Sequence, residues 1–297
     1  MLSTLKPFRL FLGCSVFVAG LSLFLNTGGS MFAAILCLLI LVAGLPHGAF
    51  DYYLLTANFT GPKLVGALAV YLVLIGITIL LWWLLPLTFL MSFLAYSAFH
   101  FGDSDWPAQV ILRKWSWGCA VVGLPCLLSP QIVASLFTTI TGLDNLAQAT
   151  AVLGWIAVPA TVYCCLPTSG VGRDNIQPSA KGEHSLMPVL LLSYSAVCTI
   201  AGPLAAFACY FACMHGPFHL KRWRNRTASG SLNAVFALTV SVLVCLVALL
   251  WFFPVTSGQT TEYVIEQSAI RYTFVALAAL TVPHMTLLFR LQRVAQP

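Results

Sequence analysis

Long apolar stretches with almost no charged residues follow one another through the chain, and they limit the fold more than any other feature. Of the 297 residues, 60% are hydrophobic and only 7% are charged, whereas a soluble domain carries about 25% charged residues. The stretches are continuous rather than alternating, which is typical of membrane-spanning helices and not of membrane barrels. In lipid, a helix satisfies its backbone hydrogen bonds internally. We therefore predict an all-α, polytopic membrane helix bundle.

Glycine, proline and charged residues divide the apolar stretches into separate helices. We expect about eight to ten transmembrane helices, all within a single integral membrane domain that covers residues 1–297. Residues 168–185 are polar and carry both charge signs, so we expect a cytoplasmic loop there. The stretch 129–148 is only partly apolar, and we expect a surface helix within it. The apolar segments are 8–25, 31–51, 64–85, 87–101, 115–128, 150–166, 186–219, 232–253 and 270–291.

Basic residues determine the predicted orientation of the chain. The segment 186–219 is longer than one span and is interrupted at Gly202-Pro203. If it forms two spans and the N-terminus is cytoplasmic, every lysine and arginine except Arg271 lies on the cytoplasmic side, as the positive-inside rule requires. We therefore expect a multi-pass protein of the cell (inner) membrane, embedded in the lipid bilayer with a cytoplasmic N-terminus. The net charge of +6 is spread over short loops, so no nucleic-acid partner is expected.

The cysteines are numerous but show no metal-binding or disulfide pattern. Most of the ten lie inside apolar stretches, and no two are spaced as CxxC. We interpret them, including Cys209 and Cys213, as small apolar side chains that fill space between helices rather than as disulfides or a zinc site.

A pair of histidines near residue 217 is the first sign of chemistry. His215 and His219 are four residues apart, so on a helix their imidazoles share one face and can offer two nitrogens to one metal ion. Pro217 lies between them and is expected to kink the helix, because it lacks a backbone donor. Taken alone, the two residues could equally be a pair of interfacial histidines.

The predicted topology places three further histidines at a similar depth. His47 and His100 lie near the cytoplasmic ends of spans that run in the same direction as the one that holds His215 and His219, and His284 lies somewhat deeper in another such span. Ionisable groups within spans are rare and usually face the interior of the bundle. We therefore predict a metal site formed by these histidines.

Polar neighbours of these histidines are candidates for orienting them. Asp51 is four residues after His47 and shares its helix face, so it could accept the second ring N–H of that histidine and fix its tautomer. Asp103 is a weaker candidate beside His100, and Asp105 is expected to be a helix-end residue in the headgroup region. For His284 we expect that it supports a metal-binding residue or lines a channel to the site, without binding the metal itself.

The ligand types narrow the choice of metal. Imidazoles without thiolates suit Fe(II), copper or zinc. A zinc ion with four histidines would be closed and structural, whereas an iron ion with four histidines keeps open positions. The six histidines are too few for a two-iron histidine-box desaturase, and two histidines on one helix cannot bind both faces of a haem.

These motifs, in this order, resemble those of the Brp/Blh family of membrane-bound β-carotene 15,15'-dioxygenases. The resemblance extends from residue 44 to about residue 290. The motifs that carry it are Gly44-Leu-Pro-His47-Gly-Ala-Phe-Asp51, then His100-Phe-Gly-x-Ser-Asp105, then Tyr210-Phe-x-x-x-His215-x-x-x-His219, and finally Val282-Pro-His284.

The resemblance implies an Fe(2+) enzyme that cleaves the central double bond of β-carotene with O2 into two molecules of all-trans-retinal. It further implies that His47, His100, His215 and His219 bind the iron. A retinal-binding rhodopsin would be a suitable partner for such a product.

Two other classes of protein fit the composition. A transporter or channel would use the histidines as a path for protons or metal ions, but the predicted outer halves of the spans carry almost no polar residues. A chaperone-like membrane protein would need the histidine cluster only for its structure.

Overall fold

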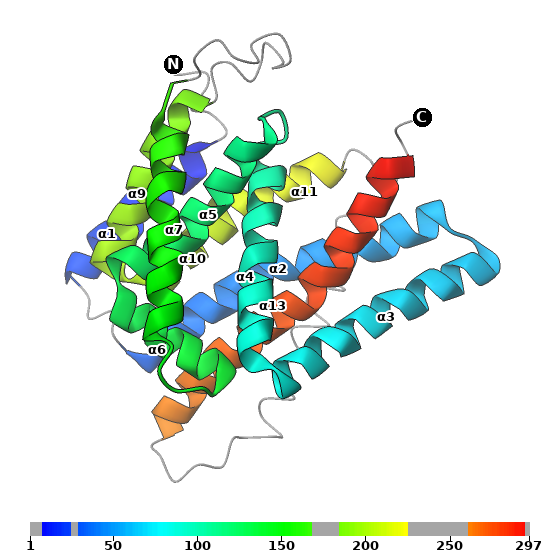
Figure 1. Ribbon diagram of the computed structural model, residues 1–297, viewed down its shortest axis with the longest axis horizontal. Coiled ribbons are helices and arrows are strands. Elements are labelled where there is room, and N and C mark those ends of the chain that lie inside the picture. The colour runs from blue at the N-terminus through cyan, green and yellow to red at the C-terminus, as the bar shows by residue number, and fades with distance from the viewer. Residues whose placement is uncertain (1–7, 25–28, 168–183, 225–260, 295–297) are drawn as a thin grey trace. The chain divides into compact units, whose positions relative to one another are not determined.

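A computed structural model describes residues 8–24, 29–167, 184–224 and 261–294, and every element in these ranges is a helix (Figure 1). The predicted all-α fold is therefore confirmed. The predicted helix at 232–253 and nearly all of the predicted loop at 168–185 lie outside the described residues. The elements are α1 (Arg9–Phe24), α2 (Ser30–Asn58), α3 (Gly61–Leu84), α4 (Pro86–Asp105), α5 (Ile111–Leu128), α6 (Pro130–Thr141), α7 (Ala147–Cys165), the short 3-10 helix η3 (His184–Leu186), α9 (Met187–Ala201), α10 (Pro203–Tyr210), the π-helical η4 (Phe211–His215), α11 (Gly216–Arg224) and α13 (Thr261–Val294).

Several of these helices are long and apolar enough to cross a membrane. Within the described ranges, four meet this condition by themselves: α2, α3, α7 and α13. Helices α5 and α6 meet it together, with a bend of 109° between them, and α1 and α9 are shorter apolar helices. The chain is therefore a membrane protein.

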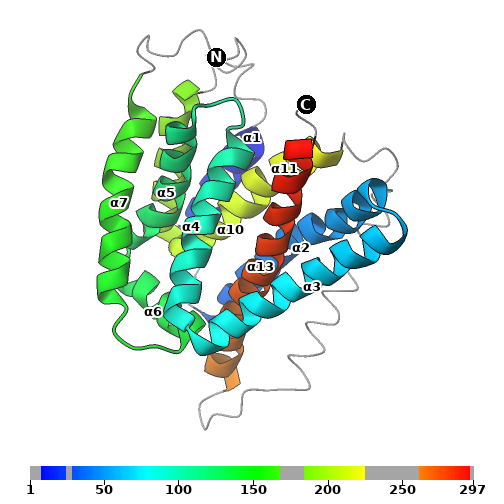
Figure 2. The ribbon, with the colours of Figure 1, turned by 45° about the vertical axis from the view of Figure 1, so that its right-hand side comes forward.

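The described chain divides into two compact units, and both are discontinuous in sequence. The first combines α1 with α5, α7, α9, α10 and η4, and the second combines α2 and α3 with α11 and α13. In the first unit α5 packs along α7, and α1 lies against α9 and α10 (Figure 1). In the second unit α13 packs against both α2 and α3 (Figure 2). One boundary between the units falls directly after His215.

Glycines bring α5 very close to the second half of α4. A Cβ atom on Gly118 would overlap the backbone carbonyl of Ala98, and one on Gly102 would overlap the carbonyl of Lys114. Helices in membranes often pack through such small residues, because van der Waals contact replaces the hydrophobic effect there. This contact fixes the end of α4 that carries His100.

We expect Gly118→Ala to lower the yield and stability of the folded protein, because the added methyl group meets backbone rather than a movable side chain. Overpacking of this kind costs about 1–3 kcal/mol. Gly76→Ala on α3 is the matched control, since nothing lies within 4 Å of the added atom. Thermal unfolding in detergent, together with the monodisperse fraction after purification, measures both variants. Equal stability of the two would contradict the close contact of α4 and α5.

The predicted interruption at Gly202-Pro203 is also present. Helix α9 ends at Ala201, Gly202 has a φ of +93°, and α10 begins at Pro203. The left-handed φ costs glycine little, and proline is well tolerated in the first turn of a helix.

Candidate metal centre

The helical segment that carries His215 and His219 changes its pitch just before Pro217. Residues 211–215 form a π-helical turn between α10 and α11. Pro217 has no N–H to donate to the carbonyl of Cys213, so the regular α-helical ladder cannot pass through this point. The expected disturbance at Pro217 therefore takes the form of a π turn, which is frequent at functional sites. His215 ends this turn, and His219 follows one helical turn later in α11.

In the first unit, His215 faces His100 of α4. Both side chains are buried, and their Nε2 atoms lie 3.2 Å apart. The other ring nitrogen of His215, Nδ1, donates to Oδ1 of Asp105 at 2.9 Å. The carboxylate fixes the tautomer of His215 and leaves the lone pair of Nε2 directed at His100.

Asp105 is buried and accepts several hydrogen bonds. From its place at a helix end we had expected a residue in the headgroup region. Its Oδ2 accepts the hydroxyl proton of Tyr210 at 2.5 Å and the indole N–H of Trp117 at 3.0 Å. These donors, with Nδ1 of His215, offset the cost of burying a carboxylate. Asp103, which we had considered as a partner of His100, forms an ion pair with Lys114 at 2.8 Å.

Aromatic rings enclose His215 on several sides. Phe211 stacks on its imidazole with ring centroids 5.4 Å apart, and Phe101 meets it edge-on at 4.8 Å. Tyr210 lies nearly parallel to it at 6.1 Å. His215 is fully buried, so these rings exclude water from the imidazole and strengthen its polar interactions.

The second unit repeats the same arrangement with different residues. The Nε2 atoms of His219 in α11 and His284 in α13 lie 3.0 Å apart, and both side chains are buried. Nδ1 of His284 donates to Oδ1 of Asp51 at 2.7 Å. The second oxygen of Asp51 accepts the hydroxyl proton of Tyr71 at 2.8 Å.

Each unit thus presents a histidine pair backed by a buried carboxylate. Two nitrogens that bind one ion at about 2.1 Å and at right angles to each other lie about 3.0 Å apart, and the measured separations are 3.0 and 3.2 Å. Two Nε2 lone pairs held so close together would repel each other unless a proton or a cation lies between them. The donors present therefore fit a metal ion, and the buried histidine pairs could bind one.

The remaining predicted residues are placed as follows. His47 lies in α2, but its side chain is outside the described residues. We expected Asp51 to orient His47; its histidine partner in the described residues is His284. Sequence reasoning gave no role to Tyr71, Trp117 or the hydroxyl group of Tyr210; nothing in the local sequence signals the first two, since each reaches its carboxylate from another helix.

The fold and the site together define a class, namely a polytopic helical membrane protein with buried histidine pairs that can hold a metal ion. The chain belongs to the beta-carotene 15,15'-dioxygenase family, whose sequence model matches residues 38–292. It is 29% identical over 264 residues to the beta-carotene 15,15'-dioxygenase of uncultured marine bacterium 66A03, which covers 84% of this chain and 90% of that protein. No solved structure matches the chain. The predicted family is confirmed, and the chain is an oxidoreductase of that family.

Proposed function

We propose that the chain cleaves the central 15,15' double bond of β-carotene with O2 and releases two molecules of all-trans-retinal. Carotene cleavage follows from membership of the family. The observation that supports metal-dependent cleavage with O2 is the presence of two buried histidine pairs. Their Nε2 atoms lie 3.0 and 3.2 Å apart, and an aspartate accepts a ring N–H from one histidine of each pair. Both atoms of O2 end in the two aldehyde groups, so the reaction balances without NAD(P)H.

We propose Fe(2+) as the metal and His100, His215, His219 and His284 as residues that hold it. His47 remains a ligand predicted from its motif. The role of His284 becomes that of a ligand, because its Nε2 is directed at His219 while its Nδ1 is held by Asp51.

Iron would supply the activation of O2. The chain supplies the positioning and the dry surroundings. Asp105 and Asp51 hold the Nδ1 protons of His215 and His284, which keeps the Nε2 lone pairs free for the metal. Phe101 and Phe211 cover His215 with apolar surface that suits a polyene as well as it excludes water.

The substrate and the location of the protein agree with each other. β-Carotene dissolves in the apolar part of a bilayer, and a chain with several apolar helices can receive it from the lipid without passage through water. We propose that the chain lies in the cell membrane with a cytoplasmic N-terminus. A retinal-binding rhodopsin in the same membrane would be the partner that takes up the product.

The test is the product formed from β-carotene by the purified, iron-loaded chain in mild detergent. We expect all-trans-retinal as the dominant product, with one atom of 18O from 18O2 in each molecule and no requirement for NAD(P)H. A His215→Ala chain serves as the inactive control. Apocarotenals of unequal length would contradict central cleavage. No cleavage by iron-loaded and correctly folded protein would instead support a transporter or a chaperone-like role.

A further inference from the structure

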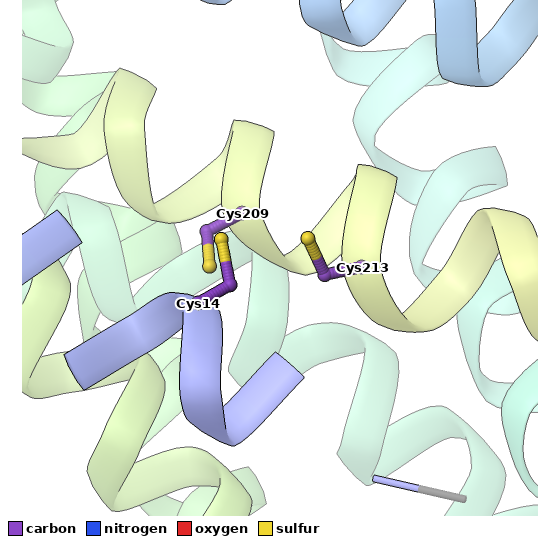
Figure 3. Close-up of side chains that lie close together, drawn as sticks. All are labelled: Cys14, Cys209 and Cys213. Carbon is purple, nitrogen blue, oxygen red and sulfur yellow. The ribbon is translucent and has the colours of Figure 1, made fainter. Parts of the chain in front are cut away.

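Three thiols from distant parts of the sequence lie together in the first unit. Cys14 of α1, Cys209 of α10 and Cys213 of η4 have sulfur atoms that are all within 4.8 Å of one another (Figure 3). Cys209 is buried, and Cys14 and Cys213 are half-buried. Cys209 and Cys213 are four residues apart and so face α1 from one side of their helical segment.

All the described cysteines are free thiols, those of the cluster included. The cluster is distinguished by bringing three of these thiols together. The sequence suggested that cysteines only fill space between helices, and single buried thiols such as Cys37 and Cys126 fit that interpretation. Three sulfurs that bind one ion at about 2.3 Å in a plane lie about 4.0 Å apart. The upper limit of 4.8 Å on the distances between the three sulfur atoms is compatible with a three-coordinate thiolate site.

The number and type of donors decide which ion suits the cluster. Structural zinc and iron–sulfur clusters both require four ligands. A hydroxyl oxygen, Oγ of Ser15, is 3.7 Å from Sγ of Cys209 and donates its proton to the carbonyl of Phe11. A hydroxyl group is a poor ligand for a soft metal, so the set remains three sulfurs, which suits Cu(I).

We propose that Cys14, Cys209 and Cys213 form a binding site for one Cu(I) ion, separate from the histidine centre. On binding, each coordinating thiol exchanges its proton for a bond to the ion. The ion would join α1 to the segment of α10 and η4 that ends at His215, two elements that otherwise meet through ordinary packing. Copper would therefore stabilise the packing of α1 against the helical segment that ends at His215, without taking part in the reaction.

The experiment uses the full iron-loaded chain in mild detergent, under anaerobic reducing conditions. Cu(I) is supplied from a chromophoric chelator, which reports the affinity of the chain. We expect one tightly bound Cu(I) per chain, at least 100-fold weaker binding in Cys14→Ala and Cys213→Ala, and unchanged binding in the matched control Cys37→Ala. Thermal unfolding of the copper-free variants shows whether they are folded, since a lost thiol should cost little by itself.

X-ray absorption on the unchanged chain gives an answer that does not depend on variants. We expect copper with three sulfur neighbours at about 2.3 Å. Nitrogen neighbours would place the ion at the histidines and overturn the proposal. It would also be overturned by binding that is unaffected in Cys14→Ala and Cys213→Ala, or by a chain that binds no Cu(I) in competition with the chelator. None of these results bears on retinal formation.

Discussion

Replacing His215 by alanine is expected to remove the iron and to abolish retinal formation while the protein still inserts and folds. Both ring nitrogens of His215 have partners in the first unit: its Nε2 lies 3.2 Å from His100, and Asp105 holds its Nδ1. Loss of this imidazole removes a metal ligand and leaves the buried carboxylate without one of its donors. Iron content by mass spectrometry and product formation by chromatography measure the two effects together.

The same substitution at the other histidines distinguishes those that bind the iron from those that do not. We expect His100→Ala, His219→Ala and His284→Ala each to lose iron and activity. His184→Ala is the control, because the sequence places His184 at the end of the polar segment 168–185, away from every motif. His47→Ala tests the ligand that only its motif predicts. If His215→Ala, His100→Ala or His219→Ala kept full iron and full turnover, the proposed centre would be wrong. If His284→Ala kept its iron but turned over slowly, this residue would return to the supporting role that the sequence suggested.

Asp105→Asn is expected to weaken iron binding by about 10–100-fold, the range found when a partner of a metal-bound histidine is removed. The amide still fills the space, but it is uncharged and raises the basicity of His215 less. The N–H₂ group of asparagine replaces one carboxylate oxygen. If it takes the place of Oδ2, it cannot accept the hydrogen bonds that Tyr210 and Trp117 donate there. Asp51→Asn should act in the same way through His284.

Asp103→Asn is the matched control, because it lies two residues earlier on the same helix and pairs with Lys114. We expect its iron affinity to equal that of the unchanged chain. The readout is the iron dissociation constant of chains whose metal-free forms unfold at similar temperatures. This comparison separates a positioning role from a structural one. Equal affinities for Asp105→Asn and Asp103→Asn would mean that Asp105 only supports the fold.

The sequence predicted most of the helices, because their signal is local. Continuous apolar stretches specify helices in lipid whatever surrounds them, and Gly202-Pro203 ended a helix where expected. The candidate metal ligands were also visible in the sequence, since histidines are rare in so apolar a chain and recur in motifs. Asp51 was selected because its spacing places it on the same helix face as His47, whereas its described histidine partner is His284 on another helix.

What the sequence could not decide is which side chains from different helices meet. Asp103 and Asp105 are both carboxylates at the end of α4, and only the packing of α4 on α5 and α10 turns one to Lys114 and buries the other against His215. Pairing of His284 with Asp51, 233 residues away, likewise depends on α13 packing against α2.

The composition of the chain by itself determined that it is a helical membrane protein, since this property follows from residues close together in sequence, and the motifs predicted a histidine centre. The tertiary structure alone decided which carboxylate supports which histidine, and it alone gathered Cys14, Cys209 and Cys213. Hydrophobic burial in lipid specifies that a helix forms but hardly its rotation, whereas close packing of small residues such as Gly118 against backbone fixes the faces that meet.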